Sequence, residues 1–325
     1  MDILMQLGVG VLSVIITLVA SMAAHLMPRT ATSISAPTTA QTAPSGGVEY
    51  TSLQSAALGR ALKFAIILPP SYSQDTKRKY PVLYFLHGMN GNEGEFERRG
   101  VAAAVSKLRD EGKIGEFIIV SPAGQNSFYL NAKNGARYED AIIQDLIPYI
   151  EKTYRAVGTP AGRSIQGISM GGWGALYLAF KHPEMFSTVT AHCAAIVPEL
   201  PHPQGGDRRS QFLSQLIGNI FGDPPDEAYF RASNPVFVVE QNLAAIKKSG
   251  LKIYFDVGDQ DRYGFTEPNK AFDEKLTKLG LGHEFHVYPG GHGWEYMISV
   301  ADHSYIFLWT NFRTDAKAAR SRAGK

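Results

Sequence analysis

The feature that most constrains this fold is a set of short apolar runs that end in glycine or at a turn. The run YPVLYFLHG, at residues 80–88, shows no polar alternation from Val82 to Leu86. A strand that is buried on both faces has this pattern, and such strands are typical of parallel sheets covered by helices. Further strands are predicted at residues 62–70, 116–124, 163–169, 186–196, 251–258 and 283–290.

Helical patterns alternate with these runs. Residues 139–155 carry Ile142, Ile143, Leu146, Ile147 and Ile150 at helical spacing, which predicts one amphipathic helix despite Pro148. More helices are predicted at residues 171–183, 269–280 and 295–312. This alternation favours an α/β fold with a mostly parallel central sheet and helices on both faces.

The two ends of the chain differ from this body. Residues 1–27 are apolar from Ile3 to Ala24 without lysine or arginine, which predicts a signal peptide or a membrane anchor. Small residues near Ala20 favour cleavage, whereas the length of the run favours an anchor, and both readings stay open. Residues 28–47 predict a flexible linker, residues 48–312 a catalytic domain, and residues 313–325 a basic C-terminal tail. We therefore expect an exported protein, periplasmic or extracellular, or a membrane-anchored one if the leader remains.

Charge and cysteine content exclude several classes of function. The formal net charge is +2 and basic residues are scattered outside the tail, so no nucleic-acid partner is predicted. The single cysteine, Cys193, rules out an internal disulfide framework and reads as a small buried side chain. The sequence has no HExxH motif and no histidine pair at ligand spacing, so we predict neither a metal nor a cofactor.

Ser169 is the candidate nucleophile. It lies in GISMG, residues 167–171, between the strand predicted at 163–169 and the helix that follows. In this setting a strained turn presents the serine hydroxyl above the sheet, and the helix N-terminus favours negative charge beside it. The pattern alone occurs by chance and also fits a simple turn serine, but the strand–turn–helix context favours a nucleophile.

A serine nucleophile needs a histidine base and a carboxylate that follow it in chain order. Three aspartates are candidates after the strand at 251–258. We expect Asp261 to be the acid, with Asp259 in reserve, because Asp256 lies within the strand.

The expected base is His292. It lies in YPGGHGW, just after the last strand, where glycines free the backbone to place the ring. The other histidines in this region read as packing or surface residues, namely His283, His286 and His303.

The expected oxyanion hole consists of two backbone amides. One is that of Met170, directly after the nucleophile, and the other is that of Met89 in HGMNGNEG, residues 87–94. A phosphate cradle is the rival reading of this glycine-rich loop. It is disfavoured because there is no GK[ST] ending and because Glu93 and Glu95 would repel a phosphate.

The ordered motifs resemble the esterase family of α/β-hydrolases that groups feruloyl esterases, S-formylglutathione hydrolases and mycolyltransferases. The likeness spans about residues 50–312 and rests on LPPSY, YPVLYFLHG, NSFYLN, IIQDLIPYIEKTYR, GISMGGWGAL, KHPEMF, FGDPPDEAYFRASNP, GDQD and GGHGW. It implies the α/β-hydrolase fold, the triad Ser169, Asp261 and His292, and the Met89 and Met170 amides as oxyanion hole. These are the same residues that the motifs and the chain order predict.

The expected function is hydrolysis of carboxylic esters, of small molecules or of carbohydrates, through an acyl-enzyme, in the manner of feruloyl or acetyl esterases. Acyl transfer to a sugar or lipid alcohol and a catalytically silent binding module are the alternatives. Residues 197–221 are expected to shape the pocket as a cap. Aromatic side chains near the site either stack on substrate or pack under the loops, namely Phe128, Tyr129, Trp173, Tyr263 and Trp294.

Overall fold

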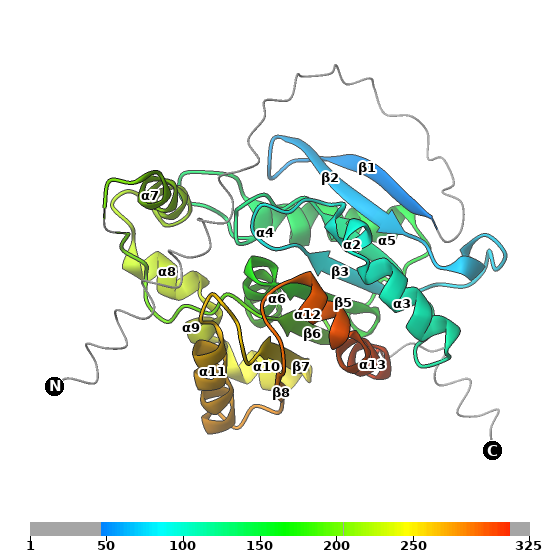
Figure 1. The fold of residues 1–325 in the computed structure, drawn as a ribbon. Helices are drawn as coiled ribbons and strands as arrows, with labels where there is room; N and C mark the ends of the chain where they lie inside the picture. Colours follow the sequence, from blue (N-terminus) through cyan, green and yellow to red (C-terminus); the bar gives the residue numbers. More distant parts are fainter. Residues whose placement is uncertain (1–46, 204, 313–325) are drawn as a thin grey trace.

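A single mixed sheet organises the protein. The computed structural model describes residues 47–203 and 205–312, and within them eight strands run in the order β1-β2-β4-β3-β5-β6-β7-β8 (Figure 1). The strands are β1 Val48–Ser55, β2 Arg60–Ile67, β3 Val82–Leu86, β4 Ile118–Pro122, β5 Arg163–Ile168, β6 Thr188–His192, β7 Lys252–Gly258 and β8 Glu284–Tyr288.

Six of these strands form the predicted parallel sheet. From β4 to β8 every neighbouring pair is parallel, whereas β1 with β2 and β2 with β4 are antiparallel. The carboxyl ends of parallel strands share one edge of a sheet, so the loops after β3, β5, β7 and β8 gather there. The expected mostly parallel α/β architecture is thus confirmed.

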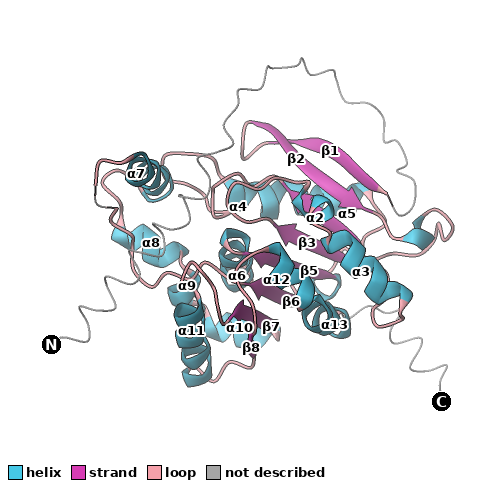
Figure 2. Cartoon of the chain, viewed as in Figure 1, coloured by secondary structure: helices cyan, strands magenta, loops and turns pink. Residues whose placement is uncertain are grey.

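Helices cover both faces of the sheet (Figure 2). They are α2 Glu95–Arg98, α3 Val101–Asp110, α4 Tyr138–Asp140, α5 Ile147–Thr153, α6 Met170–Lys181, α7 Arg208–Phe221, α8 Glu227–Ser233, α9 Pro235–Gln241, α10 Leu243–Ser249, α11 Thr266–Lys278, α12 Trp294–Ser299 and α13 Ala301–Asn311. Strand β3 explains the two layers, since Tyr84 and Leu86 pack with α6 on one face while Leu83 and Phe85 pack with α3 and α13 on the other. Each of the buried Leu and Phe side chains contributes about 1.5–3 kcal/mol.

The helix predicted at residues 139–155 is not uniform. It comprises α4, a π-helical segment η2 at Ala141–Leu146, and α5. Pro148 lies in the first turn of α5, where its missing N–H costs least. The predicted helix is therefore present, with a π-helical segment before Pro148 that the sequence pattern did not indicate.

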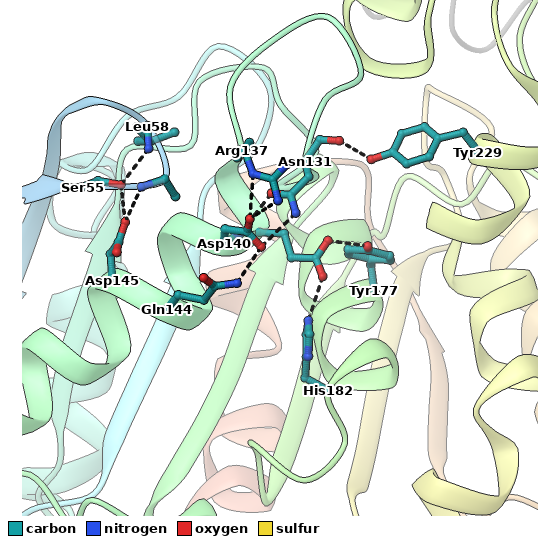
Figure 3. A network of polar contacts seen from close by, with 12 residues as sticks. Ser55, Leu58, Asn131, Arg137, Asp140, Gln144, Asp145, Tyr177, His182 and Tyr229 are labelled. Carbon is teal, nitrogen blue, oxygen red and sulfur yellow. Dashed lines mark hydrogen bonds and ion pairs between the residues drawn. The ribbon is translucent and has the colours of Figure 1, made fainter.

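A polar network anchors the loop between β4 and α4 (Figure 3). Glu139 is buried and accepts hydrogen bonds from Tyr177 Oη at 2.6 Å and from His182 Nε2 at 2.8 Å. Asp140 holds Asn131 from the same loop, whose carbonyl accepts from the Tyr229 hydroxyl of α8. The loop is thereby tied to α6 and α8.

The expectations for the chain ends lie outside the described residues. These are the signal peptide or anchor at 1–27, the linker up to residue 46 and the basic tail at 313–325. Of the helices in the described part of the chain, none has both the length and the apolar character needed to cross a bilayer.

Candidate active site

Ser169 occupies a strained turn between β5 and α6. Its φ is 57° and its ψ is −117°, a backbone conformation that residues other than glycine rarely adopt. Its amide donates to the His192 carbonyl at 2.9 Å, and its carbonyl accepts from Trp173 N and Ala195 N at 3.0 Å. The surrounding backbone thus holds the strained conformation, as expected for a serine presented at a strand-to-helix turn.

The two glycines that flank this turn are required by close backbone contacts. A Cβ on Gly167 would lie 2.0 Å from the Gly171 carbonyl oxygen, and one on Gly171 would lie 2.0 Å from the Leu86 carbonyl oxygen. Real Cβ atoms do not approach so closely, so α6 can start against β3 and β5 only with glycine at both positions.

His292 and Asp261 form a hydrogen-bonded pair. His292 Nδ1 lies 2.7 Å from Asp261 Oδ2, and the other carboxylate oxygen accepts from Tyr263 N at 2.8 Å. The Asp261 side chain is fully buried and that of His292 is 7% exposed. Because a carboxylate only accepts, the hydrogen of a neutral His292 ring is assigned to Nδ1, which leaves the lone pair of Nε2 as an acceptor.

The loops that carry this pair are joined by their backbones. Asp259 N donates to Tyr288 O, and Gln260 N donates to Gly290 O, both at 2.9 Å. The Asp259 carboxylate accepts from Gly290 N at 2.9 Å. Asp259, the expected reserve acid, therefore bonds the backbone of the histidine loop, residues 289–293, and not the His292 ring.

The remaining candidate acids and bases have other partners. Asp256 accepts hydrogen bonds from His192 Nδ1 and Tyr296 Oη, each at 3.0 Å, within the layer between the sheet and α12. His283 pairs with Asp273, His286 is half-buried, and His303 is exposed. None of them contacts the pair formed by His292 and Asp261.

Cys193 links the serine turn to this pair. It directly follows His192, whose carbonyl holds Ser169, and its Sγ lies within 4.8 Å of ligand atoms of both Asp261 and His292. The thiol is buried, and burial raises its pKa well above the ordinary value.

No hydrogen bond joins Ser169 to His292 among the described residues. Hydrogen bonds between catalytic residues often form only when substrate binds.

Two residues that line the pocket beside Ser169 have backbone amides without a partner among the described residues. Within residues 47–203 and 205–312, neither Met89 N nor Met170 N donates a hydrogen bond to the protein. Met170 is the first residue of α6, so its amide has no partner in the helix, and both residues line the pocket that contains Ser169. The amides therefore have the capacity to bind an anionic oxygen.

His87, which is not among the residues expected at the site, shapes the Met89 loop. Its Nε2 accepts from Gly124 N at 2.9 Å and its Nδ1 donates to Gly88 O at 2.7 Å. The ring is fully buried, and this desolvation lowers its pKa from the ordinary 6.5. Its position after the strand in an HG pair is the only sequence signal for this role.

An apolar pocket opens beside Ser169. Phe128 and Trp173, two of the expected substrate contacts, line it and meet edge to face with centroids 5.5 Å apart. Helix α7 and the chain just before it, which were expected to shape the pocket, supply another wall. The other lining residues are Met89, Met170, Ala195, Val197, Pro201, Leu213, Leu216, Ile217, Ile220, Phe221, Phe230 and Phe265.

One expected substrate contact, Tyr129, is corrected. The Tyr129 ring is fully buried, and its hydroxyl donates to the His87 carbonyl at 3.1 Å, so it supports the loops from below. Trp294, the first residue of α12, is partly buried against Phe85 and does not line this pocket, so its contact with substrate stays a prediction. Tyr263 meets the His292 ring edge to face at 4.6 Å and does not line the pocket.

Comparison with known proteins places the chain in a family. Residues 55–300 match the family model described as "Putative esterase". Esterase Rv1288 of Mycobacterium tuberculosis is 30% identical over 260 residues, covering 75% of this chain and 55% of the relative. An S-formylglutathione hydrolase of Arabidopsis thaliana is 26% identical over 277 residues, covering 78% and 85%. The chain thus spans about half the length of its mycobacterial relative.

Solved structures agree with this assignment. A ferulic acid esterase superimposes with a TM-score of 0.69 and 29% identity, covering 82% of this chain and 98% of that one. FphF, a fluorophosphonate-binding serine hydrolase of Staphylococcus aureus, reaches a TM-score of 0.68 at 20% identity, which shows the fold alone. With the sheet order, the strained serine turn and the matched family model together, the chain belongs to the esterase family of α/β-hydrolases.

Proposed function

We propose that this protein is a serine esterase that hydrolyses small-molecule carboxylic esters through an acyl-enzyme. Ser169 is the nucleophile, His292 the general base and acid, and Asp261 the residue that orients His292. The hydrogen bond of 2.7 Å between His292 Nδ1 and Asp261 Oδ2 carries this proposal, because it leaves Nε2 free to accept the serine proton.

In the first half of the reaction, Ser169 Oγ attacks the ester carbonyl carbon while its proton moves to His292 Nε2. The carbonyl oxygen becomes an oxyanion, which the Met89 and Met170 amides stabilise. The bond to the alcohol oxygen then breaks, and His292 returns the proton to the leaving alcohol.

In the second half, a water molecule gives a proton to His292 and attacks the acyl carbonyl. The bond to Ser169 breaks, the proton returns to the serine, and a carboxylic acid leaves. Buried Asp261 stabilises the imidazolium in both halves, since its charge lies beside the ring that becomes positive.

The substitution Ser169→Ala tests this function. Hydrolysis of p-nitrophenyl acetate should fall at least about 10⁴-fold, because the acyl-enzyme can no longer form. Ser214→Ala, at an exposed position on α7, is the matched control and should keep wild-type turnover. Wild-type turnover in a folded Ser169→Ala variant would refute the mechanism.

A further inference from the structure

We propose that the pocket beside Ser169 binds an unsubstituted aliphatic acyl chain and discriminates against hydroxylated aromatic acyl groups such as feruloyl. The inference rests on the proposed function and adds the substrate class. Its basis is the chemistry of the lining, in which Ser169 is the one residue with a polar side-chain oxygen among the described residues that form the pocket.

The pocket receives the acyl side of the ester. The leaving alcohol must lie beside His292, because this residue protonates it. Neither His292 nor Asp261 lines the pocket, whereas Ser169, Met89 and Met170 do. A carbonyl held at Ser169 and the two amides therefore directs its acyl group into the pocket and its alcohol toward His292.

Helix α7 forms one apolar wall of the pocket. Leu213, Ile217 and Ile220 are spaced at helical intervals on its inner face and are buried, while Gln215 is exposed on the outer face. The Asp207 carboxylate caps the helix by accepting from Ser210 N at 2.7 Å. The wall is thus a defined helix face whose lining side chains, the Phe221 ring included, are all apolar.

A phenolic hydroxyl would find no partner in this pocket. The remaining polar side-chain atom of the lining is Trp173 Nε1, which is buried, exposes no surface and has no hydrogen-bond partner in the described part of the chain. A hydroxyl moved from water to such a site loses its hydrogen bonds without replacement. An alkyl chain loses none and gains from every methylene buried.

The first experiment varies the acyl chain on a constant alcohol. For p-nitrophenyl acetate, butyrate, hexanoate and octanoate, kcat/KM should rise by up to about fourfold per methylene, until the pocket is full. The rise from acetate to hexanoate should be at least about tenfold. Equal or falling values from acetate to hexanoate would overturn the proposal.

The second experiment isolates the hydroxyl. Methyl 4-hydroxycinnamate and methyl 4-methylcinnamate have aromatic acyl groups of similar size and differ in one polar group. The hydroxylated ester should react about 10- to 100-fold more slowly in kcat/KM. A hydroxylated ester that reacts as fast as its methyl analogue, or faster, would contradict the apolar lining as the determinant.

The third experiment fills the pocket from α7. Ile217→Trp should abolish the preference for hexanoate over acetate, because the indole occupies the space of the chain. Gln215→Trp, on the outer face of α7, should keep the wild-type preference. If Ile217→Trp does not fold, Leu213→Phe makes the same test with a smaller insertion. A folded inner-face variant with the wild-type preference would overturn the proposal.

Failure of this inference differs from failure of the proposed function. If Ser169→Ala abolishes hydrolysis but acetate is the best substrate, the mechanism stands and the acyl class is wrong. If Ser169→Ala hydrolyses acetate as well as wild type does, the mechanism itself is wrong, whatever the chain-length series shows.

Discussion

His292 Nδ1 lies 2.7 Å from Asp261 Oδ2, although the two residues are 31 positions apart in the sequence. Both oxygens of the buried carboxylate are used, because Oδ1 accepts from Tyr263 N at 2.8 Å. The Tyr263 amide therefore fixes the carboxylate within its own loop, and the fixed carboxylate orients the imidazole of His292. Its neighbour Asp259 holds the histidine loop by the Gly290 amide instead.

This arrangement predicts different effects for two aspartates of the same loop, Asp259 and Asp261. Asp261→Asn should lower kcat about 10³- to 10⁴-fold, because an amide favours the wrong tautomer of His292. Asp259→Asn should lower kcat less than about tenfold, because the Asp259 side chain bonds the backbone of the histidine loop and not the His292 ring. Steady-state kinetics with p-nitrophenyl acetate measures both. The reverse order would exchange the roles assigned to the two carboxylates.

The glycine at the start of α6 predicts a loss of stability. Gly171→Ala should lower the free energy of unfolding by at least about 2 kcal/mol, because the new Cβ would lie 2.0 Å from the Leu86 carbonyl oxygen. Gly282→Ala, where nothing lies within 4 Å of the new Cβ, should change it by less than about 1 kcal/mol. Urea denaturation compares the two, and equal stabilities would contradict the close approach of α6 and β3.

The buried His87 ring predicts a pH dependence of stability. Burial lowers its pKa in the folded state below the ordinary 6.5 of the unfolded chain, so the unfolded state binds more protons as the pH falls. This contribution is fully present above about pH 7 and is lost as the pH falls through the folded-state pKa. Urea denaturation from pH 7 to pH 5 should show a smaller stability loss for His87→Gln than for wild type.

The matched control for this experiment is His303→Gln. The His303 side chain is 53% exposed, so its removal should leave the pH dependence as it is in the wild type. An unchanged pH dependence in His87→Gln would show that the buried ring is not its source.

The hydroxyl of Tyr296 predicts a further stability effect. It donates to Asp256 Oδ1 at 3.0 Å in a buried layer, where His192 also pairs with the carboxylate. Tyr296→Phe should lower the free energy of unfolding by about 1–3 kcal/mol, because a buried carboxylate loses a donor. Tyr50→Phe removes an exposed hydroxyl bonded to Glu97 and should cost less than about 0.5 kcal/mol. Equal costs in the two variants would argue against a buried Asp256 network.

Local sequence patterns predict much of the fold. Continuous apolar runs require burial on both faces, so the run at residues 80–88 is enough to mark a central strand. Strand β1, at Val48–Ser55, lacks this signal because exposed residues alternate with more buried ones along it, so one of its faces is open to solvent. Strand β6 ends four residues earlier than predicted, because Cys193 adopts a φ of 44° and turns the chain at a position that no glycine marks.

Side-chain direction is the part that local patterns do not supply. Phe128 and Tyr129 are adjacent and aromatic, yet only Phe128 lines the pocket. The Tyr129 ring is buried and packs against Gly124 and Gly174. Both aromatic residues have a positive φ, which the anchored loop imposes rather than the residues themselves. The pairing of Asp261 with His292 is predictable from the sequence because both follow neighbouring parallel strands.

Covalent labelling tests the proposed role of Ser169 as the activated nucleophile most directly. A fluorophosphonate probe followed by peptide mass spectrometry should place one adduct on Ser169, and His292→Ala should label at least about 100-fold more slowly. Adducts on a different residue, or no adduct on folded and hydrolytically active protein, would contradict the account.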